Sequence, residues 1–402
     1  MEYDVVVVGG GPAGLSAAYT AAQSGARVVL LERSKEIGYP VHTSGGSWIA
    51  ELKRLGVPDR FMHPIRVGQF ISAREEAVFE YSDPPGCILD VRGLYQYLAE
   101  MASLAGAEIF VNTVATKPIF ESGTLAGVKA RRFGREQIFR APLVVDASGA
   151  SCLVARHLGL TTGFDRVGVG AEYDLVAPHW PQDRVAFLFG TQVAPSGYAW
   201  IFPHGQQRVR CGVGLIHPDS DCDPRTYLEK LLANPNLLDG ALNAISRIEY
   251  HAGVIPSENF LKRTVTDGMM VVGDAGGLIS TLLGEGIRFA IEIGRMAGNV
   301  AGKALTCKRF DAPFLGQFES LWQKKYKRIF RLGAFLNRRM ARYTDAQWDR
   351  RVRTLAALGA ELVPAVLKGE FSSRNILKIV RKNPGFLTKT VALALASLWK
   401  NP

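Results

Sequence analysis

The chain has 402 residues, 47% of them hydrophobic and 21% charged, with a formal net charge of +11. This composition excludes a disordered chain, a collagen-like repeat and a coiled coil, and the length suggests two or three domains with a substantial core. The charge is unevenly placed, because residues 321–402 hold 18 Lys and Arg against 4 Asp and Glu while the rest is slightly acidic. The last fifth of the chain therefore needs its own explanation.

The cysteines and the N-terminus indicate a cytoplasmic protein. The five cysteines are odd in number and none has CxxC spacing, which favours reduced thiols. The N-terminus has no basic segment ahead of its apolar residues, so it does not resemble a signal peptide. No apolar stretch reaches the ~18–20 residues that would span a bilayer.

The first 32 residues predict one βαβ unit, with strands at 3–8 and 27–31 and a helix at 12–24. The turn between the first strand and the helix has the pattern GxGxxG, formed by Gly9, Gly11, Pro12, Ala13 and Gly14. In this context the pattern predicts a dinucleotide site, since glycines permit a tight turn and let backbone amides approach a pyrophosphate at the helix N-terminus. Glu32 ends the second strand and is expected to bind ribose hydroxyls, with Arg33 beside it.

A second cofactor-binding segment is predicted near residue 270. A buried strand at 269–272 is followed by Asp274, and then by a glycine turn that opens a long helix at about residue 286. Asp274 can bind a ribityl hydroxyl, cap a helix, or do both. The helix N-terminus can stabilise negative charge on a reduced flavin. The turn residues expected at the cofactor are Gly284, Gly286 and Ile287.

These two segments together resemble FAD-dependent oxidoreductases of the glutathione-reductase structural class. Arg92, in DVRGLYQYL, resembles the arginine that follows the flavin loop in members similar to aromatic hydroxylases. The segment VDASGAS at 145–151 resembles another family segment, with serine where aspartate is usual. The resemblance implies FAD as the tightly held cofactor, with Arg92 among its ligands.

A third motif indicates the substrate class. Residues 195–203 read PSGYAWIFP, and Gly212 and Gly214 follow after eight residues. In a strand, Tyr198, Trp200 and Phe202 would share one face and form a broad apolar wall, although an isolated YxWxF is also typical of a sandwich core. With the proline and glycines, the pattern resembles that of geranylgeranyl reductases.

This resemblance implies an isoprenoid lipid substrate, whose C=C bonds receive hydride from reduced FAD in a cavity walled by the three aromatic residues. Tyr198, Trp200 and His42 are the expected catalytic residues, with the proton coming from Tyr198, His42 or ordered water. Archaeal relatives commonly carry a cysteine in the loop that corresponds to residues 41–46, and here it is absent. A mechanism that uses that thiol is therefore not carried over.

Two other functions remain as alternatives. A flavin monooxygenase or halogenase would share the FAD frame, but halogenases are typified by a Trp-x-Trp-x-Ile-Pro motif where this chain has Tyr and Phe. A membrane-associated flavoprotein that passes electrons to a quinone would need clustered cysteines near the C-terminus for an iron–sulfur cluster, and only Cys307 lies beyond residue 222.

The electron donor is expected to bind transiently. A second Gly-rich βαβ unit is missing from the sequence, which leaves NADPH, NADH or a protein such as ferredoxin as the external reductant. No metal-ligand spacing is present, so no metal site is predicted.

The fold class that we predict is α/β (α+β). A Rossmann-like FAD-binding domain is expected to comprise 1–65, 86–160 and 261–305, a β-sheet substrate domain 66–85 and 161–260, and a basic helical region 306–402. Within that region, 321–402 either attaches the enzyme to an anionic membrane on its inner face, with 386–399 as an interfacial helix, or includes a solvated basic helix packed on the FAD domain. Nucleic acid is not an expected partner, because no binding motif accompanies the charge.

Overall fold

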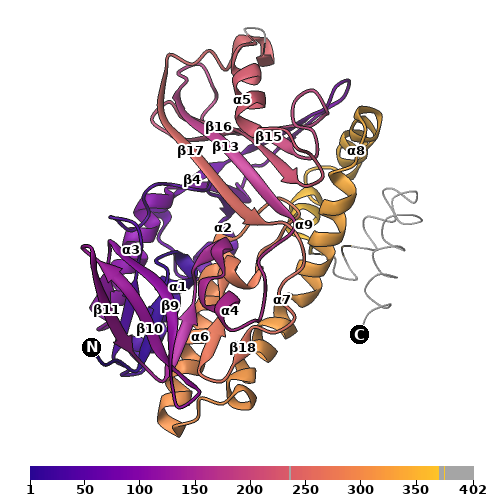
Figure 1. Ribbon diagram of the computed structural model, residues 1–402. Helices are drawn as coiled ribbons and strands as arrows, with labels where there is room; N and C mark the ends of the chain where they lie inside the picture. The colour runs from indigo at the N-terminus through magenta and orange to yellow at the C-terminus, as the bar shows by residue number, and fades with distance from the viewer. Residues whose placement is uncertain (235–236, 371–374, 376–402) are drawn as a thin grey trace.

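The computed structural model describes residues 1–234, 237–370 and 375 (Figure 1). A six-stranded sheet of order β18-β19-β12-β1-β2-β8 forms one half of the molecule, with β18 antiparallel and the other strands parallel. Its central strands are short β-branched and aliphatic runs buried on both faces, as is usual for a parallel sheet. The strands are β1 (Val5–Val8), β2 (Val28–Leu31), β8 (Glu108–Phe110), β12 (Leu143–Asp146), β18 (Val265–Thr266) and β19 (Met269–Val271).

The two faces of this sheet pack against different layers. Val5 and Val7 belong to a core shared with helices α1 (Pro12–Gln23), α3 (Val91–Leu104) and α6 (Ile287–Cys307). The alternate residues Val6 and Val8 pack towards a three-stranded antiparallel sheet of β9 (Thr113–Glu121), β10 (Thr124–Arg132) and β11 (Arg135–Arg140). The alternation follows from the period-two geometry of a strand.

Small residues bring α6 directly onto α1. Gly294, Gly298 and Gly302 recur every four residues and so lie along one face of α6. A Cβ at Gly298 would lie 1.9 Å from Thr20 Oγ1, and one at Gly294 would lie 2.2 Å from the Ala13 carbonyl oxygen. This close approach fixes the start of α6 beside the glycine turn that precedes α1.

The other half of the molecule is a seven-stranded sheet of order β17-β13-β16-β15-β14-β5-β6, antiparallel except for β14 beside β5. Helix α5 (Pro224–Leu232) packs on β13 and β16, and Figure 1 places it at the end of the molecule away from the parallel sheet. The strands are β5 (Val67–Ile71), β6 (Glu76–Glu80), β13 (Val167–Val176), β14 (Arg184–Leu188), β15 (Tyr198–Gly205), β16 (Arg208–His217) and β17 (Ser246–Pro256).

Short elements connect the two halves. A small sheet of order β3-β7-β4 lies next to β15. Helix α2 follows β3, and helix α4 follows β12 of the half that is built on the six-stranded sheet, called the cofactor half because the predicted dinucleotide-binding segments lie in it. These elements are β3 (Gly46–Trp48), β4 (Met62–Ile65), β7 (Gly86–Leu89), α2 (Ile49–Arg54) and α4 (Leu153–His157). The described residues also include 3₁₀ turns at Asp59–Phe61, Gly149–Ser151, Leu237–Gly240 and Gly273–Gly276.

The basic C-terminal region runs along both halves as α7 (Ala312–Met340), α8 (Asp345–Leu358) and α9 (Val363–Lys368) (Figure 1). Helix α7 buries Trp322, Tyr326 and Phe330 in the core of the cofactor half. Helix α8 packs Trp348 and Val352 against phenylalanines of β5 and β6. The helix expected at 386–399 lies outside the described residues.

Candidate active site

The turn before α1 has the geometry of a nucleotide-binding loop. Gly9 has φ of +110°, and a Cβ there would lie 2.2 Å from the Ala147 carbonyl oxygen. A Cβ at Gly14 would lie 2.0 Å from the Gly9 carbonyl oxygen, whereas one at Gly11 would meet nothing within 4 Å. Gly9 and Gly14 therefore serve close packing, and Gly11 borders open space at the N-terminus of α1, where Pro12 occupies the first turn.

Glu32 lies beside this turn at the end of β2. Its Oε2 accepts a hydrogen bond of 2.6 Å from the Gly10 amide, and its Oε1 accepts one of 2.7 Å from the Ser34 amide. The half-buried carboxylate keeps lone pairs for further donors, as a ribose-binding carboxylate needs. The next residue, Arg33, is exposed.

Arg92 lies in the first turn of α3, next to the chain that follows β2. Its guanidinium forms an ion pair of 2.6 Å with Glu36 and lies 5.8 Å from the centre of the Tyr39 ring. A Cβ at Gly38 would lie 3.1 Å from the Arg92 carbonyl oxygen, so the loop and the helix are in contact. The structure thus brings Arg92 to the loop after Glu32, but its charge is paired with Glu36.

Asp274 lies in the 3₁₀ turn after β19 and faces the start of α6. Burial raises the pKa of its carboxyl to about 6. Among the described residues, no hydrogen bond to this carboxylate is present, although buried carboxylates are normally paired. The alternative role as a helix cap is wrong, because Gly286 is the N-cap of α6 and Val272 that of the 3₁₀ turn. The half-buried Asp274 carboxylate can therefore accept hydrogen bonds from a bound molecule.

The segment Asp146 to Gly149 serves the fold. The Asp146 carboxylate accepts hydrogen bonds from the amides of Ser148, Val154 and Ala155, at 2.8–3.1 Å. Two of these amides belong to the first turn of α4, where the Leu153 amide also donates to Ser148 Oγ at 2.8 Å. Asp146 thus ties β12 to α4.

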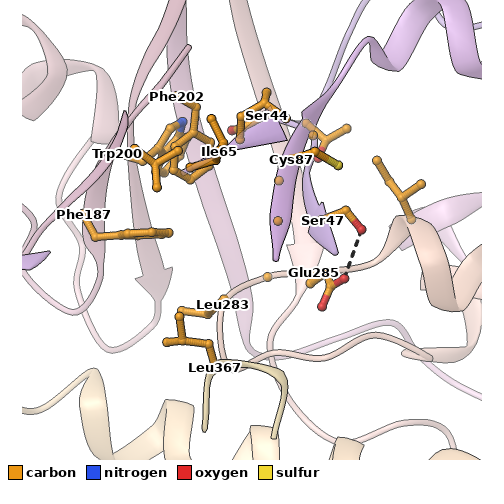
Figure 2. A pocket seen from close by; sticks show the side chains of 18 of the residues that line it. Ser44, Ser47, Ile65, Cys87, Phe187, Trp200, Phe202, Leu283, Glu285 and Leu367 are labelled. Carbon is orange, nitrogen blue, oxygen red and sulfur yellow. Dashed lines mark hydrogen bonds between the residues drawn. The ribbon is translucent and has the colours of Figure 1, made fainter. Parts of the chain in front are cut away.

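The residues of the third motif form one wall of a cavity of about 250 Å³ between the two halves. Tyr198, Trp200 and Phe202 share the inner face of β15, with ring centres 5.7 and 6.3 Å apart along the strand. Phe187 on β14 extends the wall. Figure 2 shows Trp200, Phe202 and Phe187 grouped across the cavity from Glu285, which the turn before α6 carries.

Glycines make room for the Trp200 ring. In the register of the sheet, Trp200 is opposite Gly212, and Tyr198 is opposite Gly214. A Cβ at Gly212 would lie 2.3 Å from Trp200 Cζ2, and one at Gly214 would lie 3.2 Å from Cζ3. The spacing of aromatic residues and glycines in the motif therefore has one physical cause: the indole lies flat over β16.

Tyr198 reaches from this wall to the cofactor half. Its hydroxyl donates a hydrogen bond of 2.7 Å to the Leu283 carbonyl oxygen, and burial raises the pKa of this hydroxyl above its usual value. The turn that it contacts continues through Gly284, with φ of +69°, to Gly286 and Ile287, and all three line the cavity. The expected cofactor turn and substrate wall are therefore in direct contact.

The loop 41–46 closes another side of the cavity. His42 is exposed at the rim, with its Nδ1 2.8 Å from the Ala252 carbonyl oxygen. Sequence reasoning missed Cys87, which lies on β7 opposite Ser47 and lines the cavity as a buried thiol. Burial raises its pKa to about 12, so the thiol is protonated at neutral pH.

Sequence reasoning also missed that the C-terminal region reaches this cavity. Val363, Pro364 and Leu367 of α9 line it, and Figure 2 places Leu367 near Leu283. Lys368 forms an ion pair of 2.8 Å with Glu51 of α2 and lies over the Trp48 ring. The amphipathic pattern of the C-terminal region predicted a helix, but it did not show which surface α9 covers.

Comparison with known proteins identifies the family. The protein-family model "FAD dependent oxidoreductase" matches residues 4–167, and "Geranylgeranyl reductase catalytic domain" matches residues 167–254. Digeranylgeranylglycerophospholipid reductase 2 of Methanothermobacter thermautotrophicus is 34% identical over 96% of this chain and 98% of its own length. The chain belongs to the digeranylgeranylglycerophospholipid reductase family.

A second relative supports membership of this reductase family, and a solved structure supports the fold. A digeranylgeranylglycerophospholipid reductase of Methanocaldococcus jannaschii is 31% identical over 96% of each chain. A solved structure of a geranylgeranyl bacteriochlorophyll reductase-like protein from Thermoplasma acidophilum has the same fold, with a TM-score of 0.86 and 24% identity over 98% of this chain and 99% of that one. The expected α/β fold class, the family and the FAD dependence are thereby confirmed.

Two features of this protein fit FAD as its cofactor. A bound dinucleotide would occupy the open space beside Gly11 and could donate a hydrogen bond to the unpaired Asp274 carboxylate.

In the part of the chain that the structure describes, no helix has the length and apolar character needed to cross a bilayer, and no three His, Cys, Asp or Glu side chains could together hold a metal ion.

Proposed function

We propose that this protein saturates C=C bonds in the geranylgeranyl-type chains of a glycerophospholipid. The observation that carries the proposal is the contact between the aromatic wall and the turn before α6, made by Tyr198 and the Leu283 carbonyl. This contact places an apolar cavity next to the predicted flavin site. The relatives named above act, by name, on digeranylgeranylglycerophospholipid, whose prenyl chains suit an aromatic cavity.

The residues that we propose to hold FAD come from three segments. The pyrophosphate would lie on the turn before α1, the adenosine ribose at Glu32, and the ribityl chain at Asp274. When bound and reduced, FAD supplies the hydride for the reaction. The proposed ligand set is Gly9, Gly11, Pro12, Ala13, Gly14, Glu32, Arg33, Arg92, Asp274, Gly284, Gly286 and Ile287.

The chain's own residues would orient the alkene and supply a proton. Isolated C=C bonds are weakly polarised, so orientation and exclusion of water must lower much of the barrier. Trp200 and Phe202 form the apolar surface that orients the chain. Tyr198 keeps its proton because of its raised pKa, and it is one proposed donor. His42 at the rim is the other, since its Nε2 is not the nitrogen bonded to Ala252.

Anaerobic turnover tests this function. The purified flavoprotein would be reduced with dithionite and mixed with digeranylgeranylglycerophospholipid, and products would be followed by mass. We expect gains of two hydrogens per step. No hydrogenated product under these conditions, with the flavin reoxidised and an oxygen atom inserted into the product only after oxygen is admitted, would refute the proposal and favour a monooxygenase.

The domains would divide the work as follows. Residues 1–65, 86–160 and 261–305 would bind FAD, and 66–85 with 161–260 would bind the lipid. The reductant would be NADPH, NADH or a ferredoxin that binds only during reduction. Stopped-flow reduction of the oxidised enzyme by each donor separates these cases.

We also propose that the basic region binds an anionic membrane from which the lipid enters. Exposed cations gather on α7 and α8, among them Lys324, Arg328 and Arg350. Each basic residue near an anionic leaflet contributes ~1 kcal/mol. Deleting the region would remove buried core, so the test uses charge reversal instead.

Binding to anionic vesicles, measured by liposome co-sedimentation, should weaken strongly when Lys324, Arg328 and Arg350 are all replaced by Glu. The matched control replaces three exposed cations of the β9–β11 sheet by Glu: Lys117, Arg131 and Arg135. Equal binding by both triple variants would contradict the proposal.

A further inference from the structure

The cavity side of the seven-stranded sheet changes from aromatic to charged between β15 and β13. In register across the sheet, Trp200 is followed by Gly212, Glu172 and His251. Glu172 and His251 are 3% and 5% exposed, and both line the cavity. A buried carboxylate and imidazole thus lie in the same cross-strand row as the indole.

Hydrogen bonds join this row. Trp200 Nε1 donates to Glu172 Oε2 at 2.6 Å, and His251 Nδ1 lies 2.9 Å from Glu172 Oε1. His251 Nε2 lies 3.0 Å from Glu249 Oε2 at the edge of the sheet. Both oxygens of Glu172 are therefore occupied, one by the indole and one by the imidazole.

The charges of the row favour an ionised Glu172. Burial alone would raise its pKa, but the hydrogen bond from His251 and the buried Arg210 outweigh burial and hold the pKa below its usual value. Burial would lower the pKa of His251, and its bonds to Glu172 and Glu249 raise it instead. The indole N–H thus donates to a charged acceptor, which makes a shorter and stronger hydrogen bond than a neutral one.

The surface beneath Trp200 gives the indole little lateral restraint. The ring lies over Gly212 and Gly214, and a Cβ at Gly170 would also be only 3.7 Å from its Cη2. Glycines have no side chains that could stop the ring from sliding or turning in its plane. Tyr198 and Phe202 flank the ring along β15, and the bond to Glu172 holds the N–H edge of the indole towards β13.

We infer that Glu172, held by His251, is a positioning residue that sets the orientation of Trp200 and thereby which C=C bond of the lipid is reduced. This inference rests on the proposed function for its substrate, while the hydrogen bond itself can be tested without substrate or cofactor. Glu172 acts through the indole, so its effect on selectivity depends on the indole N–H.

The first test is spectroscopic and uses the full chain. The protein has six tryptophans, and the Nε1–H resonance of Trp200 is identified by its loss in Trp200→Phe. We expect this resonance far downfield, and we expect Glu172→Gln to move it upfield. The matched control is Glu229→Gln, since Glu229 accepts from the Tyr173 hydroxyl on the same β13. An unmoved resonance in Glu172→Gln would overturn the inference.

The second test measures product selectivity during anaerobic turnover. Glu172→Gln should lower kcat/KM by about tenfold, and it should broaden the set of partly reduced products. In the Trp200→Phe background, the same substitution should have almost no further effect. Additive effects of the two substitutions would refute action through the indole. A wild-type enzyme that reduces no prenyl lipid would instead refute the proposed function, and the resonance test would stand.

Discussion

Replacing Gly212 by alanine tests whether the indole of Trp200 must lie flat on β16. The added Cβ would be 2.3 Å from Trp200 Cζ2 and 2.9 Å from Nε1. Favourable carbon contacts begin at ~3.5 Å, so the ring must move by about 1.2 Å towards the cavity. Backbone strain is not involved, because Gly212 is absent from the positive-φ positions. The perturbation is therefore a displacement of the substrate wall.

Two effects follow from that displacement. Overpacking in a well-packed region costs ~1–3 kcal/mol, and a shift of about 1 Å at a reacting centre can reduce a rate about a hundredfold. We expect Gly212→Ala to lose about a hundredfold in kcat/KM for prenyl reduction while its Kd for FAD stays unchanged. Flavin titration and anaerobic product analysis measure the two quantities.

A matched variant separates displacement from the general effect of a methyl group. Gly170→Ala would place its Cβ 3.7 Å from the same ring, which is ordinary contact, and its loss should be much smaller. In a Trp200→Phe background, the smaller ring should relieve most of the effect of Gly212→Ala. Wild-type kinetics in Gly212→Ala would refute the reasoning.

Three further predictions concern charged residues. Asp274→Asn should bind FAD more weakly in a fluorescence titration. Because burial raises the folded pKa from 3.8 to about 6, ionised Asp274 destabilises the folded apoprotein above about pH 6, by at most ~3 kcal/mol. The free energy of unfolding of the apoprotein, measured with urea, should thus be larger for Asp274→Asn than for the wild type at pH 8, and the two should be equal at pH 4. His251 has a raised folded pKa, so its stabilisation is complete below pH 6.5 and is lost as the pH rises through the folded value. The difference in the free energy of unfolding between the wild type and His251→Asn should therefore shrink as the pH rises. A difference that grows with pH would contradict this reasoning. Lys368→Met leaves the half-buried Glu51 without its ion-pair partner and so weakens the attachment of α9 beside the cavity. It should raise the KM for lipid and speed proteolysis after α8, and Lys324→Met, at an exposed position of α7, should do neither.

Sequence patterns predicted those parts of the site that depend on local geometry. Gly9 and Gly14 have the backbone contacts that the turn requires, and the period of two along 198–202 correctly placed three aromatic residues on one face. Asp274 was predicted as a cofactor ligand because it comes soon after a buried strand, and the structure places it beside the start of α6. Each of these features is set by residues close together in the chain.

Contacts between distant segments could not be predicted in this way. Glu172 and His251 lie 79 positions apart and meet only through the register of β13 and β17. Cys87 reaches the cavity because β7 pairs with β3. A weak signal was present in Gly170, since a glycine inside a strand marks a close approach, but the sequence does not show that the Trp200 ring is what approaches it.

The wall formed by α9 has a consequence for biosynthesis. Strands of the seven-stranded sheet are complete at residue 256 and those of the parallel sheet at residue 271, but the cavity lacks a side until residue 367 has emerged from the ribosome. Until then, the growing chain exposes an aromatic hollow to solvent. Nascent chains of this enzyme that stall after α6 should therefore be good clients for chaperones that recognise exposed apolar surface.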